Sequence, residues 1–273
     1  MVRGKLAGIV VLGLLLAGCG GAIDDSSHPP RPRAWSKERF ERLMRQRAET
    51  ATRSRTARPS TDSIRVGALF FNDPKGDHYC TAGVVDSPHD NLLVTAAHCL
   101  YGNGAYDRDI VFVPGYHDGE TPYGVWQTRT LIVDDRWIKS GDPDMDVGFV
   151  VLQSAKNGKN IEQILGANRL GFDEGFDHVV RVTGYPNNED QPITCLARTF
   201  QQSAFQLRFA CNGYFGGTSG SPWVTRFDTH KRTGEIIGVI GGFEQGGNTD
   251  AISYSPYFDD DVRRLYEKAV TQS

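Results

Sequence analysis

The chain has 273 residues, of which 39% are hydrophobic, and it contains 31 glycines and 13 prolines. This length suits one good-sized domain, or one built of two barrels, with additional segments. The formal net charge of −3 gives no reason to expect a nucleic-acid partner. No internal repeat of fixed period is present, which argues against solenoids and propellers. Long helical periodicity is scarce, so the composition favours β structure.

Residues 1–18 have the pattern of a signal peptide. Arg3 and Lys5 precede an apolar run over residues 6–17, which is too short for a membrane-spanning helix. The run ends in Leu16-Ala17-Gly18-Cys19, which resembles the lipobox of bacterial lipoproteins. Lipidation of Cys19 would attach the protein to a membrane. The alternative is an ordinary secretory signal, and both interpretations predict export to the cell envelope or the extracellular space.

The five cysteines fit an oxidising compartment. They are Cys19, Cys80, Cys99, Cys195 and Cys211. If Cys19 carries lipid, the other four can form two disulfides, for which three pairings are possible. We expect Cys80–Cys99 and Cys195–Cys211, because these pairs close the two shortest loops. The close Cys-x-x-Cys spacing of a zinc site is missing, so we expect no metal and no other cofactor.

Charge divides the chain after the signal peptide. Residues 31–58 contain ten Lys/Arg and three Glu, a net charge of about +7, whereas residues 59–273 contain 18 basic and 28 acidic residues. We therefore expect a Pro/Arg-rich tether or propeptide over 19–62 and a folded domain, active as a monomer, over 63–273. A basic arm lying on an anionic cell surface is the alternative for the first of these segments.

The folded domain is predicted to consist mainly of short strands. Runs rich in β-branched and aromatic residues alternate with turn signals, a spacing typical of antiparallel sandwiches or barrels. The runs cover 64–71, 82–85, 92–95, 110–113, 128–133, 147–152, 178–182, 205–210, 222–225 and 235–240. Only the C-terminal end reads as a helix, with an acidic start at 259–261. Its apolar stripe comprises Val262, Leu265, Tyr266 and Ala269.

His98 is the first candidate catalytic residue. It follows the apolar run Leu92-Leu93-Val94 and two alanines, so it is expected at a strand end beside a tight turn. A disulfide at the adjacent Cys99 would hold the imidazole in place. Histidine is suited to act as a general base near neutral pH.

Ser219 is the candidate nucleophile. It stands in Gly217-Thr218-Ser219-Gly220-Ser221-Pro222, where glycines allow the backbone amides to turn towards one point. A serine hydroxyl needs an adjacent base to become nucleophilic. The N–H groups of Gly217 and Ser219 are the candidate oxyanion hole.

Asp146 is the candidate for the carboxylate that orients the histidine. It directly precedes the apolar run 147–152 and is therefore expected in the interior, whereas Asp142 and Asp144 are expected to remain in a loop. A calcium-binding loop is excluded, because the sixth position is Val147 and the twelfth is Gln153.

These three motifs, in the order His98, Asp146, Ser219, resemble the chymotrypsin-like (trypsin-fold) serine proteases over roughly residues 63–270. An α/β-hydrolase would require Gly-x-Ser-x-Gly and the order Ser, acid, His. The resemblance implies an all-β fold of two six-stranded antiparallel barrels with a C-terminal helix. His98 and Asp146 would belong to the first barrel and Ser219 to the second.

The resemblance also implies a secreted or cell-surface endopeptidase that acts on polypeptides. Animal members have an aspartate at the position of Thr218, which pairs with a newly cut N-terminus. The likeness is therefore closer to bacterial glutamyl-endopeptidase-like members. A protease dedicated to one partner or to its own processing is an alternative, and so is a catalytically silent binding protein.

The substrate pocket is expected between two segments. One wall would include Gly213 and Tyr214, and the other Gly241, Gly242 and Phe243. Segment 212–216 has no acidic residue, so an uncharged side chain is expected before the cleaved bond (P1), although Glu244 could reach the pocket and admit a basic one.

Overall fold

The computed structural model describes residues 55–60, 63–71 and 78–273. The predicted signal peptide over 1–18, the lipidation site Cys19 and most of the predicted tether or propeptide over 19–62 lie outside these residues. Within the described ranges, no helix is long and apolar enough to cross a membrane.

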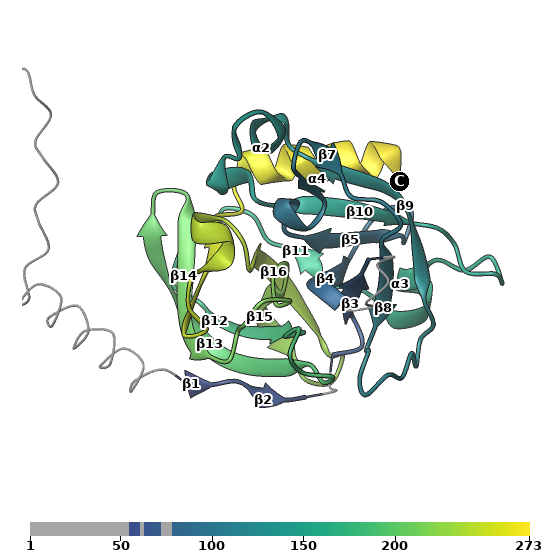
Figure 1. Ribbon diagram of the computed structural model, residues 1–273, viewed down its shortest axis with the longest axis horizontal. Coiled ribbons are helices and arrows are strands. Elements are labelled where there is room, and N and C mark those ends of the chain that lie inside the picture. Colours follow the sequence, from purple (N-terminus) through teal and green to yellow (C-terminus); the bar gives the residue numbers. More distant parts are fainter. Residues whose placement is uncertain (1–54, 61–62, 72–77) are drawn as a thin grey trace, which may run out of the picture. The chain divides into compact units, whose positions relative to one another are not determined.

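The first half of the domain is a closed six-stranded antiparallel barrel (Figure 1). In spatial order the strands are β10 (Gly148–Leu152), β5 (Leu92–Thr95), β4 (His78–Val85), β3 (Val66–Phe70), β8 (Val111–Pro114) and β9 (Trp126–Val133). Every residue of β5 and β10 is buried. Their β-branched and leucine side chains suit a pleated surface that is covered on both faces.

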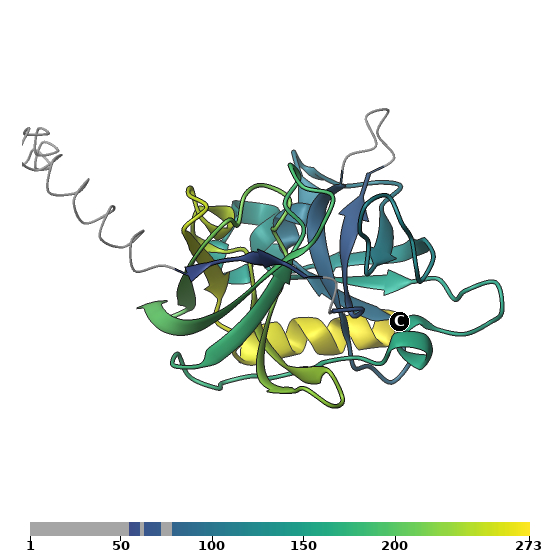
Figure 2. The same ribbon diagram turned by 90° about the horizontal axis from the view of Figure 1, so that it is seen from below.

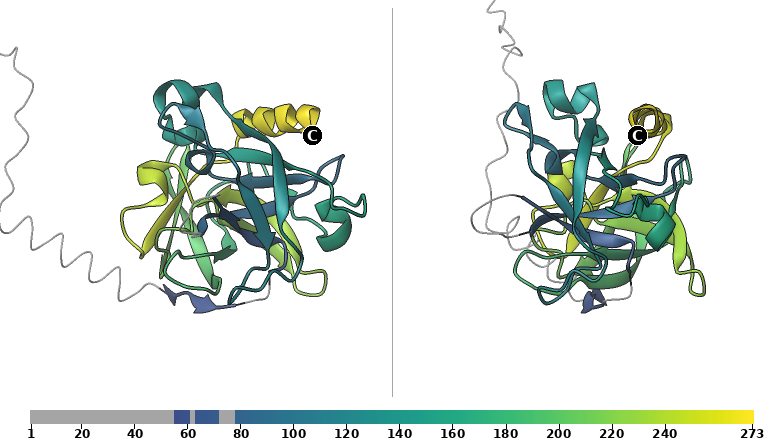
Figure 3. Two further views of the ribbon diagram at one scale, coloured as in Figure 1. Left: turned by 45° about the vertical axis from the view of Figure 1, so that its right-hand side comes forward. Right: turned by 90° about the vertical axis from the view of Figure 1, so that its right-hand side faces the viewer.

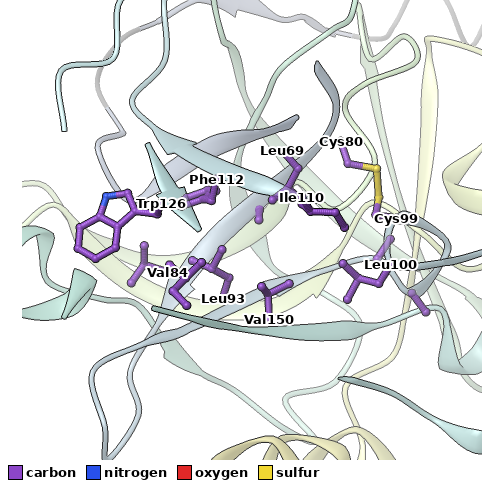
Figure 4. Close-up of a cluster of buried hydrophobic side chains, with 14 of the residues drawn as sticks. Leu69, Cys80, Val84, Leu93, Cys99, Leu100, Ile110, Phe112, Trp126 and Val150 are labelled. Atoms are coloured by element: carbon purple, nitrogen blue, oxygen red, sulfur yellow. A yellow bond between two sulfur atoms is a disulfide. The ribbon is translucent and has the colours of Figure 1, made fainter. Parts of the chain in front are cut away.

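Large apolar side chains fill this barrel. Leu69, Leu93, Phe112 and Val150 form part of one buried cluster (Figure 4). The disulfide between Cys80 of β4 and Cys99 lies at one side of the cluster and joins the barrel wall to the segment that carries His98.

The second half is built on β12 (Val179–Gly184), β13 (Ile193–Ser203), β14 (Gln206–Asn212), β15 (Pro222–Asp228), β16 (Thr233–Val239) and β17 (Ile252–Pro256). Strand β17 pairs with β14, and Gly241 N, just beyond β16, donates to Tyr254 O of β17 at 3.0 Å. The sheet thus curls back on itself. The two-barrel architecture expected from the sequence is confirmed.

Two short strands join the second sheet ahead of the expected domain start. Strand β1 (Arg55–Thr56) runs parallel to β14, and β2 (Arg58–Pro59) runs antiparallel to β13 (Figure 2). Strand pairing therefore begins inside the segment predicted as tether or propeptide. A further short strand, β11 (Arg169–Leu170), pairs in parallel with β16.

The C-terminal helix α4 (Asp260–Gln272) packs on β9 and β10 of the first barrel (Figures 1 and 3). Asp259 caps it by accepting hydrogen bonds from Asp261 N and Val262 N. Val262, Leu265 and Ala269 are buried, as the predicted apolar stripe requires. The helix therefore ties the end of the second sheet to the first barrel.

Smaller elements complete the fold. They are the hairpin of β6 (Tyr101–Gly102) and β7 (Ala105–Tyr106), the helices α2 (Asp135–Ser140) and α3 (Ile161–Leu165), and the 3₁₀ turns η1 (Ala97–Cys99), η2 (Pro143–Met145) and η3 (Phe243–Gly246). The second disulfide, Cys195–Cys211, joins β13 to β14. Both disulfides match the expected pairs, and they fit an exported protein.

Candidate active site

His98 and Asp146 meet at the open end of the first barrel. His98 lies in η1, directly after β5, and Asp146 lies between η2 and β10. Asp146 Oδ2 is 2.8 Å from His98 Nδ1, and Asp146 Oδ1 accepts a hydrogen bond from His98 N at 2.9 Å. Because a carboxylate can only accept, this contact places the ring proton on Nδ1 and leaves Nε2 as the free base.

Asp146 is completely buried and still well paired. Gly242 N donates to Oδ2 at 2.8 Å, so that the carboxylate has three N–H partners, two of them backbone amides. Burial of a charged carboxylate is tolerated when such donors replace water. Asp142 and Asp144 remain partly exposed in the η2 segment. Gln206 of β14 holds that segment by donating to Pro143 O and to Asp144 Oδ1.

Ser219 lies in the turn that precedes β15, against the end of β5. Its carbonyl accepts from Thr81 N at 2.7 Å. At Gly220, whose φ is +81°, a Cβ atom would stand 2.1 Å from Thr95 Oγ1 and 2.2 Å from Thr81 O. Only glycine allows this close approach, which brings the turn against Thr95 of the first barrel. Thr95 precedes His98 by three residues. Ser219 itself is half-buried.

Ser219 Oγ and His98 are both described, and no hydrogen bond joins them in this structure. A serine–histidine contact is often long without substrate and shortens when substrate binds.

The amides of Gly217 and Ser219 are free to bind an anion. Among the described residues neither N–H has an acceptor. The carbonyl of Gly216 accepts from Asn187 N at 2.7 Å. Because C=O and N–H point in opposite directions in a trans peptide, the Gly217 N–H is turned away from Asn187. Gly217 has a φ of +94°, and a Cβ there would stand 2.5 Å from Tyr185 O.

The other carbonyls of this turn are also held. Thr81 Oγ1 donates to Gly217 O at 3.0 Å and accepts from Tyr185 N. Thr218 donates to Phe215 O through both its N–H and its hydroxyl, and Ser221 Oγ donates to Thr218 O. Each carbonyl from 215 to 219 therefore has a donor. We call residues 215–219 the oxyanion turn.

Comparisons with solved structures show proteins of the same fold. The protease Anisep from Arthrobacter nicotinovorans is 26% identical over 79% of this chain and 100% of its own, with a TM-score of 0.69. The thermostable serine protease AL20 from an extremophilic microorganism is 28% identical over 78% of this chain and 100% of its own, with a TM-score of 0.68. The chain therefore has the fold of chymotrypsin-like serine proteases.

A Glu endopeptidase shares the protease fold with a TM-score of 0.65, over 80% of this chain and 98% of its own, at 16% identity. No protein-family model matches the sequence. No curated protein matches it either. The serine endopeptidase class therefore rests on structural likeness.

The pocket beside Ser219 in this protease differs in part from the sequence expectation. Its lining includes Tyr214, as expected, together with residues 215–216, Thr218, Ile240 and 245–250. The other expected residues lie elsewhere. Gly213 lines a neighbouring pocket, Gly242 lines the pocket beside His98, Gly241 packs on Asp146, and the Phe243 ring packs on Tyr254.

Glu244 also lines the pocket beside His98 and not the one beside Ser219. The cause is the backbone path of residues 242–250, which we call the pocket loop. Glu244 and Gln245 have φ values of +53° and +52°, and Gly246 and Gly247 follow at +100° and +128°. This left-handed run reverses the chain and brings Asn248–Asp250 to the pocket. Non-glycine residues rarely adopt such angles, so this backbone path was not predictable from residue type.

One group of metal-ligand side chains lies close together within the described ranges, namely Cys80, His98 and Cys99. Its two sulfur atoms form the disulfide and are not thiolates. The group therefore belongs to the protease scaffold.

Proposed function

We propose that this protein hydrolyses peptide bonds in polypeptides through an acyl-enzyme on Ser219, with His98 as base and acid and Asp146 as the orienting carboxylate. The observation that carries the proposal is the pair of free amides at Gly217 and Ser219, in a turn whose carbonyls are all bonded. Free donors with a fixed direction are what a developing oxyanion requires.

In the first half of the reaction, Ser219 Oγ attacks the carbonyl carbon and its proton moves to His98 Nε2. The carbonyl oxygen becomes an oxyanion and accepts hydrogen bonds from the N–H groups of Gly217 and Ser219. When the tetrahedral intermediate collapses, the C–N bond breaks and His98 gives its proton to the leaving amine. Asp146 stabilises the imidazolium through Nδ1–H, at the 2.8 Å contact described above.

In the second half, water attacks the ester on Ser219 and transfers a proton to His98 Nε2. The same amides hold the second oxyanion, and its collapse releases the carboxylic acid product. The proton returns from His98 to Ser219 Oγ, so the protein ends the cycle unchanged.

Two alternatives remain distinct from this proposal. A catalytically silent binding protein of the same fold would not need free amides beside a serine. A protease dedicated to one partner or to its own processing would share the whole mechanism.

Export is part of the proposal. Detergent-phase partitioning of the wild type and a Cys19→Ser variant separates a lipoprotein from a fully secreted form.

Labelling with a fluorophosphonate probe tests the proposed nucleophile directly. We expect Ser219 of the wild type to be labelled, and Ser219→Ala to be unlabelled and to lose about 10⁶-fold in kcat on a peptide substrate. His98→Ala should also lose labelling, because the hydroxyl then has no base. Ser203→Ala is the control, since this serine is exposed at the end of β13. Equal labelling of wild type and Ser219→Ala would refute the assignment.

A further inference from the structure

The pocket beside Ser219 has one charged side chain in its lining. This pocket has a volume of about 240 Å³, and Asp250 is the one Asp, Glu, Lys, Arg or His among the residues around it. Tyr214 N donates to Asp250 O at 3.2 Å, which holds the Asp250 backbone beside Tyr214 in the pocket lining. The lining thus joins the candidate nucleophile and a carboxylate in one cavity.

The Asp250 carboxylate has no internal partner within the described part of the chain. No hydrogen bond or ion pair there involves its side chain, which is half-buried. By contrast, Asp146 has three N–H donors, and the exposed Asp177 is paired with Arg198. A half-buried carboxylate without a partner favours a cation that enters from outside.

The two adjoining pockets carry the same sign of charge. One shares Phe215 with the Asp250 pocket and is lined by Asp118, Glu189 and Asp190. The other shares Gln245 with it and is lined by His98 and Glu244. No Lys or Arg lines any of the three pockets. Together they form an acidic surface on both sides of Ser219, which attracts a cationic chain.

We infer that Asp250 is a specificity-determining residue, which selects polypeptides with Lys or Arg at the P1 position by pairing with that side chain. This inference rests on the proposed function of the same site. It replaces the sequence expectation of an uncharged P1 residue. It also differs from glutamate specificity, because a P1 carboxylate would be brought against the Asp250 carboxylate and repelled.

Peptide substrates that differ only at P1 test the inference on the full chain. We expect kcat/KM for Arg or Lys to exceed that for Gln, Leu or Glu by about 100-fold or more. Asp250→Asn keeps the shape of the side chain and removes its charge, so it should reduce the ratio of kcat/KM for Arg to kcat/KM for Leu by at least about tenfold. Asp177→Asn, which removes an exposed carboxylate outside these pockets, should leave the P1 preference unchanged.

A binding measurement separates this inference from the proposed function. Calorimetric titration of Ser219→Ala with benzamidinium, an aromatic cation, and with neutral benzamide needs no catalysis. We expect the cation to bind at least about tenfold more tightly, and Asp250→Asn to abolish the difference.

The outcomes are distinct. If the fluorophosphonate probe labels Ser219 and Arg or Lys peptides are cleaved no faster than the others, the P1 inference is wrong and the proposed function stands. If neither labelling nor cleavage occurs, the proposed function fails, and the titration decides the role of Asp250. Equal binding of benzamidinium and benzamide then overturns the inference.

Discussion

The oxyanion turn and the pocket loop lie on either side of the same cavity and obtain their shapes in different ways. The oxyanion turn is fixed by scaffold groups, among them Thr81 and Asn187. The pocket loop takes its path largely from its own backbone, with left-handed residues from Glu244 to Gly247. On the proposed function, the groups for bond chemistry are held by the barrels, whereas the groups for substrate choice are held by a loop, whose sequence can change without moving the barrels.

Removal of the Thr81 hydroxyl is the strongest way to disturb the oxyanion turn alone. Thr81→Val keeps the volume but removes the Oγ1 contacts with Gly217 O and Tyr185 N. We expect kcat/KM to fall by about 10- to 100-fold for every P1 residue, because the peptide between Gly217 and Thr218, which connects the two candidate donor amides, loses its anchor. Steady-state kinetics on the P1 series measure this effect.

Thr81→Ser is the control, since it retains the hydroxyl. We expect it to keep near wild-type kcat. A Thr81→Val variant that changed only the P1 preference would contradict the division between the two regions.

Gln206 is the residue with which to disturb the pocket loop. Its Oε1 accepts from Phe243 N, and its Nε2 donates to Pro143 O and Asp144 Oδ1. Gln206→Met removes these bonds at similar volume. We expect KM to rise by about three- to tenfold with little change in kcat, because the loop is loosened and the oxyanion turn is not.

Gln201→Met, at an exposed position of β13, is the matched control and should behave as wild type. If Gln206→Met lowered kcat as strongly as Thr81→Val does, the loop would not be separable from the turn.

Glu162 gives a smaller effect that should spare both regions. Burial, with Asp86 and Asp90 nearby, raises its pKa to about 7 from 4.5. The folded state therefore keeps a proton that the unfolded state has lost, and stability falls as pH rises from 4.5 to about 7. Glu162→Gln has no charge to bury, so at pH near 8 it should be more stable than wild type by up to about 1 kcal/mol, allowing for partial exposure.

Urea denaturation at pH values near 4 and 8 checks this prediction, with the exposed Glu267→Gln as control. The gain from Glu162→Gln should appear only at the higher pH, and the pH profile of kcat should not change. The same gain at both pH values would contradict the assigned pKa.

Much of the architecture was predictable because strong local patterns coincide with burial. The runs that became β5 and β10 are apolar throughout, and they are buried throughout. Strand β13 was not predicted, because its small side chains are buried and its large apolar side chains face solvent. Its inward side chains include Cys195 and Ala197, whereas Leu196 and Phe200 are exposed. The helices α2 and α3 were also missed, because five or six residues carry too little periodicity.

The candidate site was likewise predictable only in part. The positions of His98 and Asp146 follow from the apolar strands next to them, and the two side chains are in contact. The pocket did not follow from spacing along the chain. Asp250 reaches it only because the left-handed residues from Glu244 onwards reverse the backbone, a conformation that Glu and Gln rarely adopt.

The hydroxyl of Thr218 has a consequence for control of the protein. It bonds to Phe215 O, three residues away in the same turn, and Thr81 and Asn187 supply the remaining contacts from within the described fold. These groups are present as soon as the domain has folded, so the turn needs no cut elsewhere in the chain to reach its shape. Restraint of such an enzyme would depend on the timing of its export and on which polypeptides reach it, not on chemical activation of this turn.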